Sequence, residues 1–267
     1  MEPEHKKEKE EELQAREREL EIHYPTSNTY TNSLGMEFEL ITPGEFLMGA
    51  APQDDRAEEN EKPQHKVWIS KPFYLGKYLV TQQEWENLMG NNPSEFKQAG
   101  KRAPVETVSW NDCQEFIKKL NHKESRMYRL PTEAEWEFAA RGGGAIRSPF
   151  NSFLYTYGDD TSILGEYAWF EKNSKDTTYP VGQKKPNSIG LYDMMGNTWE
   201  WCEDWYDNYY YKKSHEEDPK GSDIGENKVL RGGSWYYNDK DCRISNRFNR
   251  FPDLKYYNYG FRLVLLP

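Results

Sequence analysis

One segment of the chain combines residue types that suit either catalysis or molecular contact. Residues 231–243 read R-G-G-S-W-Y-Y-N-D-K-D-C-R. Two glycines and a serine set up a tight backbone, and aromatic and amide side chains follow before a single cysteine. If the protein is an enzyme, Ser234 and Cys242 are the candidate catalytic residues. If it is not, the aromatic run indicates a surface that contacts a ligand.

The longer stretch 235–259 has the composition of a contact surface. It contains five of the chain's 19 tyrosines, together with four Asn and three Asp. Tyrosine supplies rigid contact area, and short polar side chains supply adaptable hydrogen bonds. The predicted ligand-binding residues are Trp235, Tyr236, Tyr237, Asn238, Asp239, Asn246, Phe248, Asn249, Tyr256, Tyr257, Asn258 and Tyr259.

A second stretch, residues 190–201, carries oxygen donors. It reads G-L-Y-D-M-M-G-N-T-W-E-W, so Asp193 and Glu200 contribute two carboxylates. Gly196 permits a bend that aims backbone carbonyls inward, and a hard cation prefers such a mixture of carboxylate and carbonyl oxygens. The alternative is a tight turn packed by the two tryptophans, with the acids at the surface.

Four arginines accompany these stretches. They are Arg231, Arg243, Arg247 and Arg262. They are candidates for catalytic cations, but we favour a structural role in which they pair with carboxylates or carbonyls of the loops.

The composition argues against several classes of protein. A net charge of −10 lacks the basic footprint of nonspecific nucleic-acid binding and gives no attraction to an anionic membrane. Three cysteines form no disulfide framework, and the five histidines lack the spacing of a zinc site. The N-terminus does not resemble a secretory signal, and no apolar run is long enough to span a bilayer. We therefore expect a cytoplasmic protein with no nucleic-acid or membrane partner.

The first 33 residues differ from the rest of the chain. Residues 1–22 are almost all Glu, Lys, Arg, Gln and Leu, which is typical of a solvated helix with little to pack. Residues 24–33 are polar and predict a linker. We interpret residues 1–33 as a charged helix and linker, with partner binding by the helix as the alternative, and residues 34–267 as one domain.

Hydrophobic patterns predict the elements that position the two stretches. Residues 36–48 alternate apolar and polar side chains around a Pro-Gly pair, which predicts a β-hairpin. Residues 65–80 predict two further strands. Three capping boxes predict helices that begin after Thr81, Ser109 and Thr132, because each has an acid three residues later.

Glycines predict where two of these helices end. The first stops at Gly90 and the third at Gly142. In the second helix, Cys113 shares an apolar face with three other residues, which favours a core role over a nucleophile. After Gly144 the helical periodicity fades, and the final stretch, residues 260–266, is apolar enough to be a central strand.

A set of motifs in chain order resembles one protein family. The motifs are G-M-E-F-E-L-I-T-P-G-E-F-L-M-G, Y-L-V-T-Q-Q-E-W, P-V-E-T-V-S-W-N-D-C, Y-R-L-P-T-E-A-E-W-E-F-A-A-R-G-G, G-L-Y-D-M-M-G-N-T-W-E-W-C-E-D-W, L-R-G-G-S-W and G-F-R-L-V. Together they look like the formylglycine-generating enzyme family, also called the sulfatase-modifying-factor family, over about residues 34–267. The resemblance implies an α+β fold, the family's variant of the C-type lectin fold, with small twisted antiparallel sheets, a few helices and much irregular loop.

The best-known members oxidise a cysteine in a sulfatase to formylglycine, using oxygen and copper held by two cysteines. Copper(I) is soft and prefers thiolates. Counted forward from Gly-Gly-Ser, Tyr237 stands where the first cysteine is expected and Cys242 where the second is. Counted backward from Gly-Phe-Arg, the segment is a few residues short and Cys242 misses that place too. Either way one thiolate is absent, so we expect no two-cysteine copper site.

The resemblance also implies a structural calcium ion. The family's calcium loop maps onto Asp193, Gly196, Thr198 and Glu200, so we expect calcium as the cofactor. The family's other calcium site lies upstream, where residues 166–176 differ too much in length for ligands to be carried over.

Two functions follow. The first is a calcium-stabilised module that binds a protein, peptide or glycan through residues 235–259. That composition is similar to the variable proteins of diversity-generating retroelements, although related proteins also carry such loops without diversification. The alternative is an oxidoreductase of the same family that acts on a peptide or small molecule by a mechanism without paired thiolates.

Overall fold

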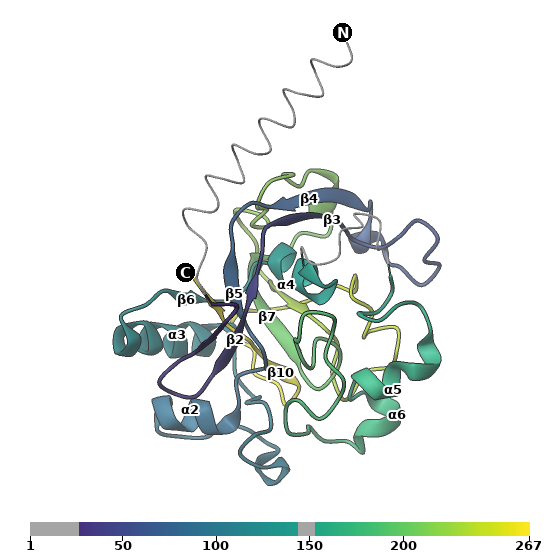
Figure 1. Ribbon diagram of the computed structural model, residues 1–267. Helices are drawn as coiled ribbons and strands as arrows, with labels where there is room; N and C mark the ends of the chain where they lie inside the picture. The colour runs from purple at the N-terminus through teal and green to yellow at the C-terminus, as the bar shows by residue number, and fades with distance from the viewer. Residues whose placement is uncertain (1–26, 144–152) are drawn as a thin grey trace.

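The computed structural model describes residues 27–143 and 153–267. Two β-sheets form its centre, a separate two-stranded sheet lies at the top of the view in Figure 1, and short helices lie around them. Long irregular segments join these elements, which confirms the α+β class and the predicted abundance of loop. The helix predicted over residues 1–22 lies outside the described residues.

The first sheet has five strands in the order β1-β2-β5-β11-β6. They are β1 (Thr29–Thr31), β2 (Glu37–Ile41), β5 (Phe73–Gly76), β6 (Tyr128–Arg129) and β11 (Val264–Leu265). All the pairings in this sheet are antiparallel. β11 lies between β5 and β6, so the prediction that the apolar C-terminal stretch forms a central strand is confirmed.

Strand β1 corrects the predicted domain boundary. Thr29–Thr31 falls in the stretch predicted as a linker, yet all three residues pair with β2. The ring of Tyr30 packs against Phe38 and Tyr74, with centroid distances of 6.2 and 6.1 Å. An aromatic residue between two β-branched ones suits a strand. The domain therefore begins before residue 34.

The hairpin predicted over residues 36–48 is wrong in its pairing. The Pro-Gly pair does separate two strands, but β2 pairs with β1 and β5, whereas β3 (Gly44–Met48) pairs with β4 (His65–Ile69). An alternating pattern specifies which face is buried but not which strand lies alongside. The β3–β4 sheet packs on α4 (Glu133–Ala140), where the rings of Phe46 and Phe138 are 5.3 Å apart.

The second sheet has four strands in the order β10-β7-β8-β9. They are β7 (Trp199–Trp205), β8 (Lys228–Arg231), β9 (Phe248–Arg250) and β10 (Tyr259–Gly260). β10 pairs with β7 in parallel, so the prediction of antiparallel sheets fails at this edge. Residues 190–201, the stretch with the oxygen donors, enter this sheet at β7. Residues 235–259, which we term the contact stretch, follow β8 and return through β9 and β10.

All three predicted capping boxes are confirmed. They begin α2 (Gln82–Met89), α3 (Trp110–Glu124) and α4 (Glu133–Ala140). The shorter helices are η1 (Glu59–Glu61), η2 (Lys97–Ala99), η4 (Thr161–Ile163), α5 (Leu164–Tyr167), α6 (Glu171–Ser174) and η5 (Tyr210–Lys212). In the part of the chain that the structure describes, no helix has the length and apolarity needed to cross a membrane.

The core forms around the helices and β7. Cys113 on α3 is fully buried in a cluster that also holds Trp199 and Trp201 of β7, so its predicted core role is confirmed. Trp136 of α4 belongs to a second buried cluster. α2 and α3 lie together on one side of the sheets and α5 and α6 on the other, as Figure 1 shows.

Candidate binding face

The segment 231–243 begins with a turn that glycine alone fits. Gly232 and Gly233 follow β8 with φ angles of 97° and 76°. A Cβ on Gly233 would lie 2.9 Å from the Sγ atom of Cys242, so any larger residue would clash as well as being strained. The two glycines therefore fold the chain back onto Cys242.

The candidate catalytic residues, Ser234 and Cys242, are both fully buried. The Oγ atom of Ser234 accepts a hydrogen bond from Asn258 at 3.2 Å. Cys242 packs with Phe170 in a small apolar cluster, and burial raises the pKa of its thiol. A buried, neutral thiol is a poor nucleophile. The structure thus places both candidate residues in the support of the turn.

Buried ion pairs form the layer beneath the contact stretch. Arg247 binds Glu133 through Nε at 2.7 Å and Nη2 at 2.8 Å. Arg231 pairs with Glu137 and also reaches Glu133 at 3.4 Å. Burial alone would raise the pKa of Glu133, but the guanidiniums of Arg247 and Arg231 outweigh it and hold this pKa below its ordinary value. The structural role predicted for these arginines is confirmed.

Arg243 ties the same stretch to a distant loop. Its guanidinium donates to both carboxylate oxygens of Glu61 and to Asp54, each at 2.7 Å. Nearby, Arg56 pairs with Asp239 at 3.1 Å. The contact stretch is therefore anchored from below and from one side.

The predicted ligand-binding residues divide by burial. Tyr236 and Tyr256 are 53% and 43% exposed, and Asn238 is exposed as well. Five others are half-buried: Tyr237, Asp239, Phe248, Asn249 and Tyr257. The remaining four are buried, so the prediction that they face a ligand is corrected: Trp235, Asn246, Asn258 and Tyr259.

Packing and hydrogen bonds explain why three of these side chains point inward. The indole of Trp235 donates to the carbonyl of Tyr257 at 3.3 Å, and the ring of Tyr259 lies 5.6 Å from that of Trp201. Asn258 donates to Ser234. Composition does not distinguish rings that support a surface from rings that form it.

Six rings make one connected group, which we term the aromatic face: Phe96, Tyr236, Tyr237, Phe248, Tyr256 and Tyr257. Tyr256 and Tyr257 have centroids 4.1 Å apart, and Tyr236 lies 6.4 Å from Tyr257 and 5.7 Å from Tyr237. Tyr237 contacts Phe248 at 5.9 Å. The rings before and after the buried residues 242–247 are thus brought together.

Phe96 is the member of the aromatic face that the sequence prediction missed. It precedes η2 and meets Trp235 edge-on at 5.2 Å and Tyr257 at 6.1 Å. Nothing in its own surroundings in the sequence signals this role, which depends on tertiary contact. Phe251, which directly follows β9, is 55% exposed and is not among the predicted ligand-binding residues.

Two of the predicted calcium ligands, Asp193 and Gly196, lie on the loop that enters β7. Asp193 is buried, with Oδ2 accepting from the Gly182 amide at 2.8 Å and Oδ1 from Asn197 at 3.3 Å. Burial raises the pKa of this carboxyl group. A Cβ on Gly196 would lie 2.2 Å from the carbonyl oxygen of Trp169, so glycine is required for that approach.

Glu200, another predicted ligand, has different surroundings. Arg262 binds it through Nε at 2.6 Å and Nη2 at 2.8 Å, and the Trp136 indole donates to it at 3.0 Å. Its charge is therefore already balanced by the protein, and Arg262 has the structural role predicted for it. The remaining predicted ligand, Thr198, has a buried hydroxyl oxygen without a partner among the described residues.

The donors around this loop fit a cation at Asp193 better than at Glu200. Among the described residues, the hydrogen bonds to Asp193 come from neutral N–H groups, whereas a cation at Glu200 would have to share that carboxylate with a guanidinium. Within residues 27–143 and 153–267, no three His, Cys, Asp or Glu side chains are grouped to hold a metal. An ion at Asp193 would therefore take most of its ligands from backbone carbonyls.

Three comparisons connect this geometry to known proteins. The formylglycine-generating enzyme of Streptomyces coelicolor is 39% identical over 173 residues, which cover 60% of this chain and 51% of that enzyme. The structure of Treponema denticola variable protein 1 superimposes with a TM-score of 0.77 and 29% identity, covering 91% of this chain and all of the other. PvdO from Pseudomonas aeruginosa gives a TM-score of 0.78 at 25% identity, covering 91% and 99%.

The chain spans about half the length of the Streptomyces enzyme. Its described fold is that of the whole Treponema protein and of almost all of PvdO, which confirms the predicted variant of the C-type lectin fold. Residues 25–266 match the family of sulfatase-modifying factor enzyme 1-like domains. The chain belongs to this family.

Proposed function

We propose that the protein is a binding module whose aromatic face contacts a protein, peptide or glycan. The observation that carries this proposal is the arrangement of two layers. Exposed rings of Tyr236 and Tyr256 stand on a buried layer that is fixed by Trp235 and by the arginine pairs. Rings held in this way lose little conformational entropy on binding, which is the property that makes tyrosine effective in recognition surfaces.

The likeness to Treponema denticola variable protein 1 supports the same function. We propose further that the exposed stretches are diversified by a retroelement. Residues 236–241 and 248–257 are exposed or half-buried, whereas residues 242–247 carry the ion pairs and are buried. Sequence changes in residues 236–241 and 248–257 would leave the buried ion pairs of residues 242–247 in place. A near-copy of codons 235–259 beside a reverse transcriptase gene in the genome would support diversification, and a genome without both would exclude it.

A structural calcium ion at Asp193 is part of the proposal. The ion would take Asp193 as its charged ligand, with Gly196 and Thr198 contributing carbonyls and Glu200 shared with Arg262. Calcium would bind Asp193 directly, and would fix the loop that leads into β7 and so the sheet under the aromatic face.

The binding proposal is tested by comparing the full chain with a Tyr236→Ala/Tyr256→Ala double variant on arrays of peptides and glycans. A matched control, Tyr209→Ala, removes an exposed tyrosine that is 58% accessible and lies outside the aromatic face. We expect every bound array element to lose at least tenfold in affinity in the double variant and to be unaffected by the control. Equal loss in both, or no loss in the double variant, would contradict the proposal.

A further inference from the structure

Arg250, the last residue of β9, places a positive charge at the aromatic face. Side chains two positions apart leave a strand on the same side, and the Cζ atom of Arg250 lies 4.0 Å from the ring centroid of Phe248. Burial raises the pKa of Tyr237 and of Tyr259, and the charge of Arg250 partly offsets both rises. The guanidinium therefore lies among these rings and not away from them.

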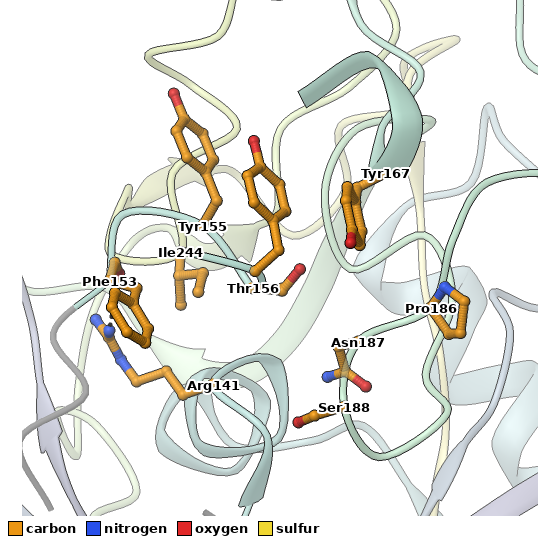
Figure 2. Close-up of a pocket in the computed structure, with 10 residues that line it drawn as sticks. Arg141, Phe153, Tyr155, Thr156, Tyr167, Pro186, Asn187, Ser188 and Ile244 are labelled. Carbon is orange, nitrogen blue, oxygen red and sulfur yellow. Dashed lines mark hydrogen bonds between the residues drawn. The ribbon is translucent and has the colours of Figure 1, made fainter. Parts of the chain in front are cut away.

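Arg250 differs from the other arginines of residues 231–262 in its partners. Each of the others is buried and pairs with a glutamate: Arg231, Arg243, Arg247 and Arg262. Arg141, in the wall of a separate pocket of about 420 Å³ (Figure 2), also has a carboxylate partner, with its Nη2 atom 2.8 Å from Glu137. Arg250 donates through Nη1 to the carbonyl of Asn249 at 2.9 Å, and no carboxylate of the described residues pairs with it.

A ligand carboxylate would complete the surroundings of Arg250. Its side chain is half-buried, so it is partly removed from water without the charge balance that the other arginines have. A guanidinium is a planar fork that can hold both oxygens of a carboxylate. The net charge of −10 does not oppose this contact strongly, because physiological salt screens exposed charges that are more than about 8 Å apart.

The turn that follows Arg250 adds exposed apolar area. Phe251 is 55% exposed and Leu254 is 37% exposed. The turn is held in place, since the amide of Asn111 donates to the carbonyl of Pro252 at 3.1 Å. An aliphatic side chain such as that of Leu254 packs well on the apolar side chains of a peptide, whereas it offers no partner to the hydroxyls of a sugar.

We propose that the aromatic face recognises an acidic peptide segment of another protein. Arg250 would hold an Asp or Glu side chain of that segment, and residues 251–254 would contact an apolar side chain beside it. Binding energy at protein interfaces is concentrated in Tyr, Trp and Arg, and this surface combines an arginine with exposed tyrosines. The inference rests on the proposed binding function of the aromatic face and names the class of its ligand.

The test screens the full chain against an array of dodecapeptides of random sequence. Each bound peptide is then compared with a counterpart in which Asp and Glu are replaced by Asn and Gln. We expect the bound peptides to contain an acidic residue, and the amide counterparts to bind about tenfold more weakly or worse, the effect of one lost hydrogen-bonded charge. This comparison uses the parent chain, so it does not depend on the stability of any variant.

Two substitutions of Arg250 locate the effect. Arg250→Gln should bind the acidic and amide forms equally, and Arg250→Lys should keep part of the difference, because it retains the charge without the planar fork. Arg102→Gln is the matched control. Arg102 also lies over a tyrosine ring, that of Tyr78 at 5.6 Å, and it makes no ion pair within the described part of the chain. Its substitution removes the same charge outside the aromatic face and should leave the difference unchanged.

The inference is overturned if no peptide binds, if the amide forms bind as well as the acidic forms, or if Arg250→Gln keeps the difference. Binding of sialylated glycans in place of peptides would also overturn it. If the amide forms bind equally well and the Tyr236→Ala/Tyr256→Ala variant loses them, the aromatic face is a binding site for another class of ligand. Peptide binding that survives in that double variant would instead contradict the proposed function itself.

Discussion

Arg262 holds both carboxylate oxygens of Glu200, with its Nε atom 2.6 Å from one and its Nη2 atom 2.8 Å from the other. Both side chains are buried to at least 99%. The pair joins the segment after β10 to the start of β7 directly under the contact stretch, so it links the predicted metal loop to the scaffold of the aromatic face.

Breaking this pair should be costly. Arg262→Met leaves Glu200 charged and buried without its partner, and we expect a loss of about 3–5 kcal/mol in the free energy of unfolding. Urea denaturation measures it. Glu166→Gln is the control, because Glu166 and Lys185 are an exposed pair whose loss should cost about 0–1 kcal/mol. Equal effects in the two variants would show that burial of the Arg262 pair does not matter.

Calcium should stabilise the chain through Asp193. After removal of divalent ions with a chelator, we expect added calcium to raise the melting temperature, because a ligand that binds only the folded state stabilises it. Asp193→Asn should abolish the rise. Magnesium serves as the control ion, since it demands a smaller and more regular site. A melting temperature indifferent to calcium in the parent chain would exclude the proposed ion.

Supporting and exposed rings should respond differently to truncation. Trp235→Ala removes a ring that is 3% exposed, and we expect a loss of about 3–5 kcal/mol in stability. Tyr236→Ala removes the neighbouring ring, which is 53% exposed, and should change stability by less than about 1 kcal/mol. Denaturant titration of both variants tests this. Strong destabilisation by Tyr236→Ala would mean that this ring belongs to the core and is not available for a ligand.

The sequence predicts local features well and long-range ones poorly. The capping boxes at Thr81, Ser109 and Thr132 are correct because each depends on residues within one helical turn. The 36–48 hairpin is wrong because the partner of β3 is chosen by packing on α4. Phe96 was missed for the same reason, since its contact with Trp235 spans more than 130 positions. The division of residues 235–259 into buried and exposed rings follows from tertiary contacts, which composition does not reveal.

Cys242 should be chemically silent in the folded chain. Its thiol is fully buried, and its raised pKa keeps it protonated. We expect no reaction with Ellman's reagent near pH 8 in the folded chain. After denaturant is added, Cys242 should react with the reagent together with Cys113 and Cys202, which are also buried. Copper(I) titration of the parent and of Cys242→Ser provides an independent measurement. Tight copper binding that disappears in Cys242→Ser would revive the thiolate chemistry that the burial of this residue disfavours.

Asp204 should make stability fall as the pH rises. This carboxyl group is buried and accepts a hydrogen bond from the backbone amide of Glu133 at 2.8 Å. Burial, and to a smaller extent the negative charge of Glu133, raises the pKa of Asp204 well above its ordinary value. An acid whose pKa is raised in the folded state binds its proton more tightly there than in the unfolded chain. The destabilisation that Asp204 causes is therefore absent below the unfolded pKa of about 3.9, and it grows as the pH rises toward the folded pKa.

We expect the Asp204→Asn variant to be more stable than the parent, by a difference in the free energy of unfolding that widens between pH 5 and pH 8. Urea titrations at several pH values measure the margin, with exposed Asp223→Asn as the control. A margin that is constant with pH would mean that Asp204 is ionised in the folded chain, paired with a cation that its present contacts do not supply.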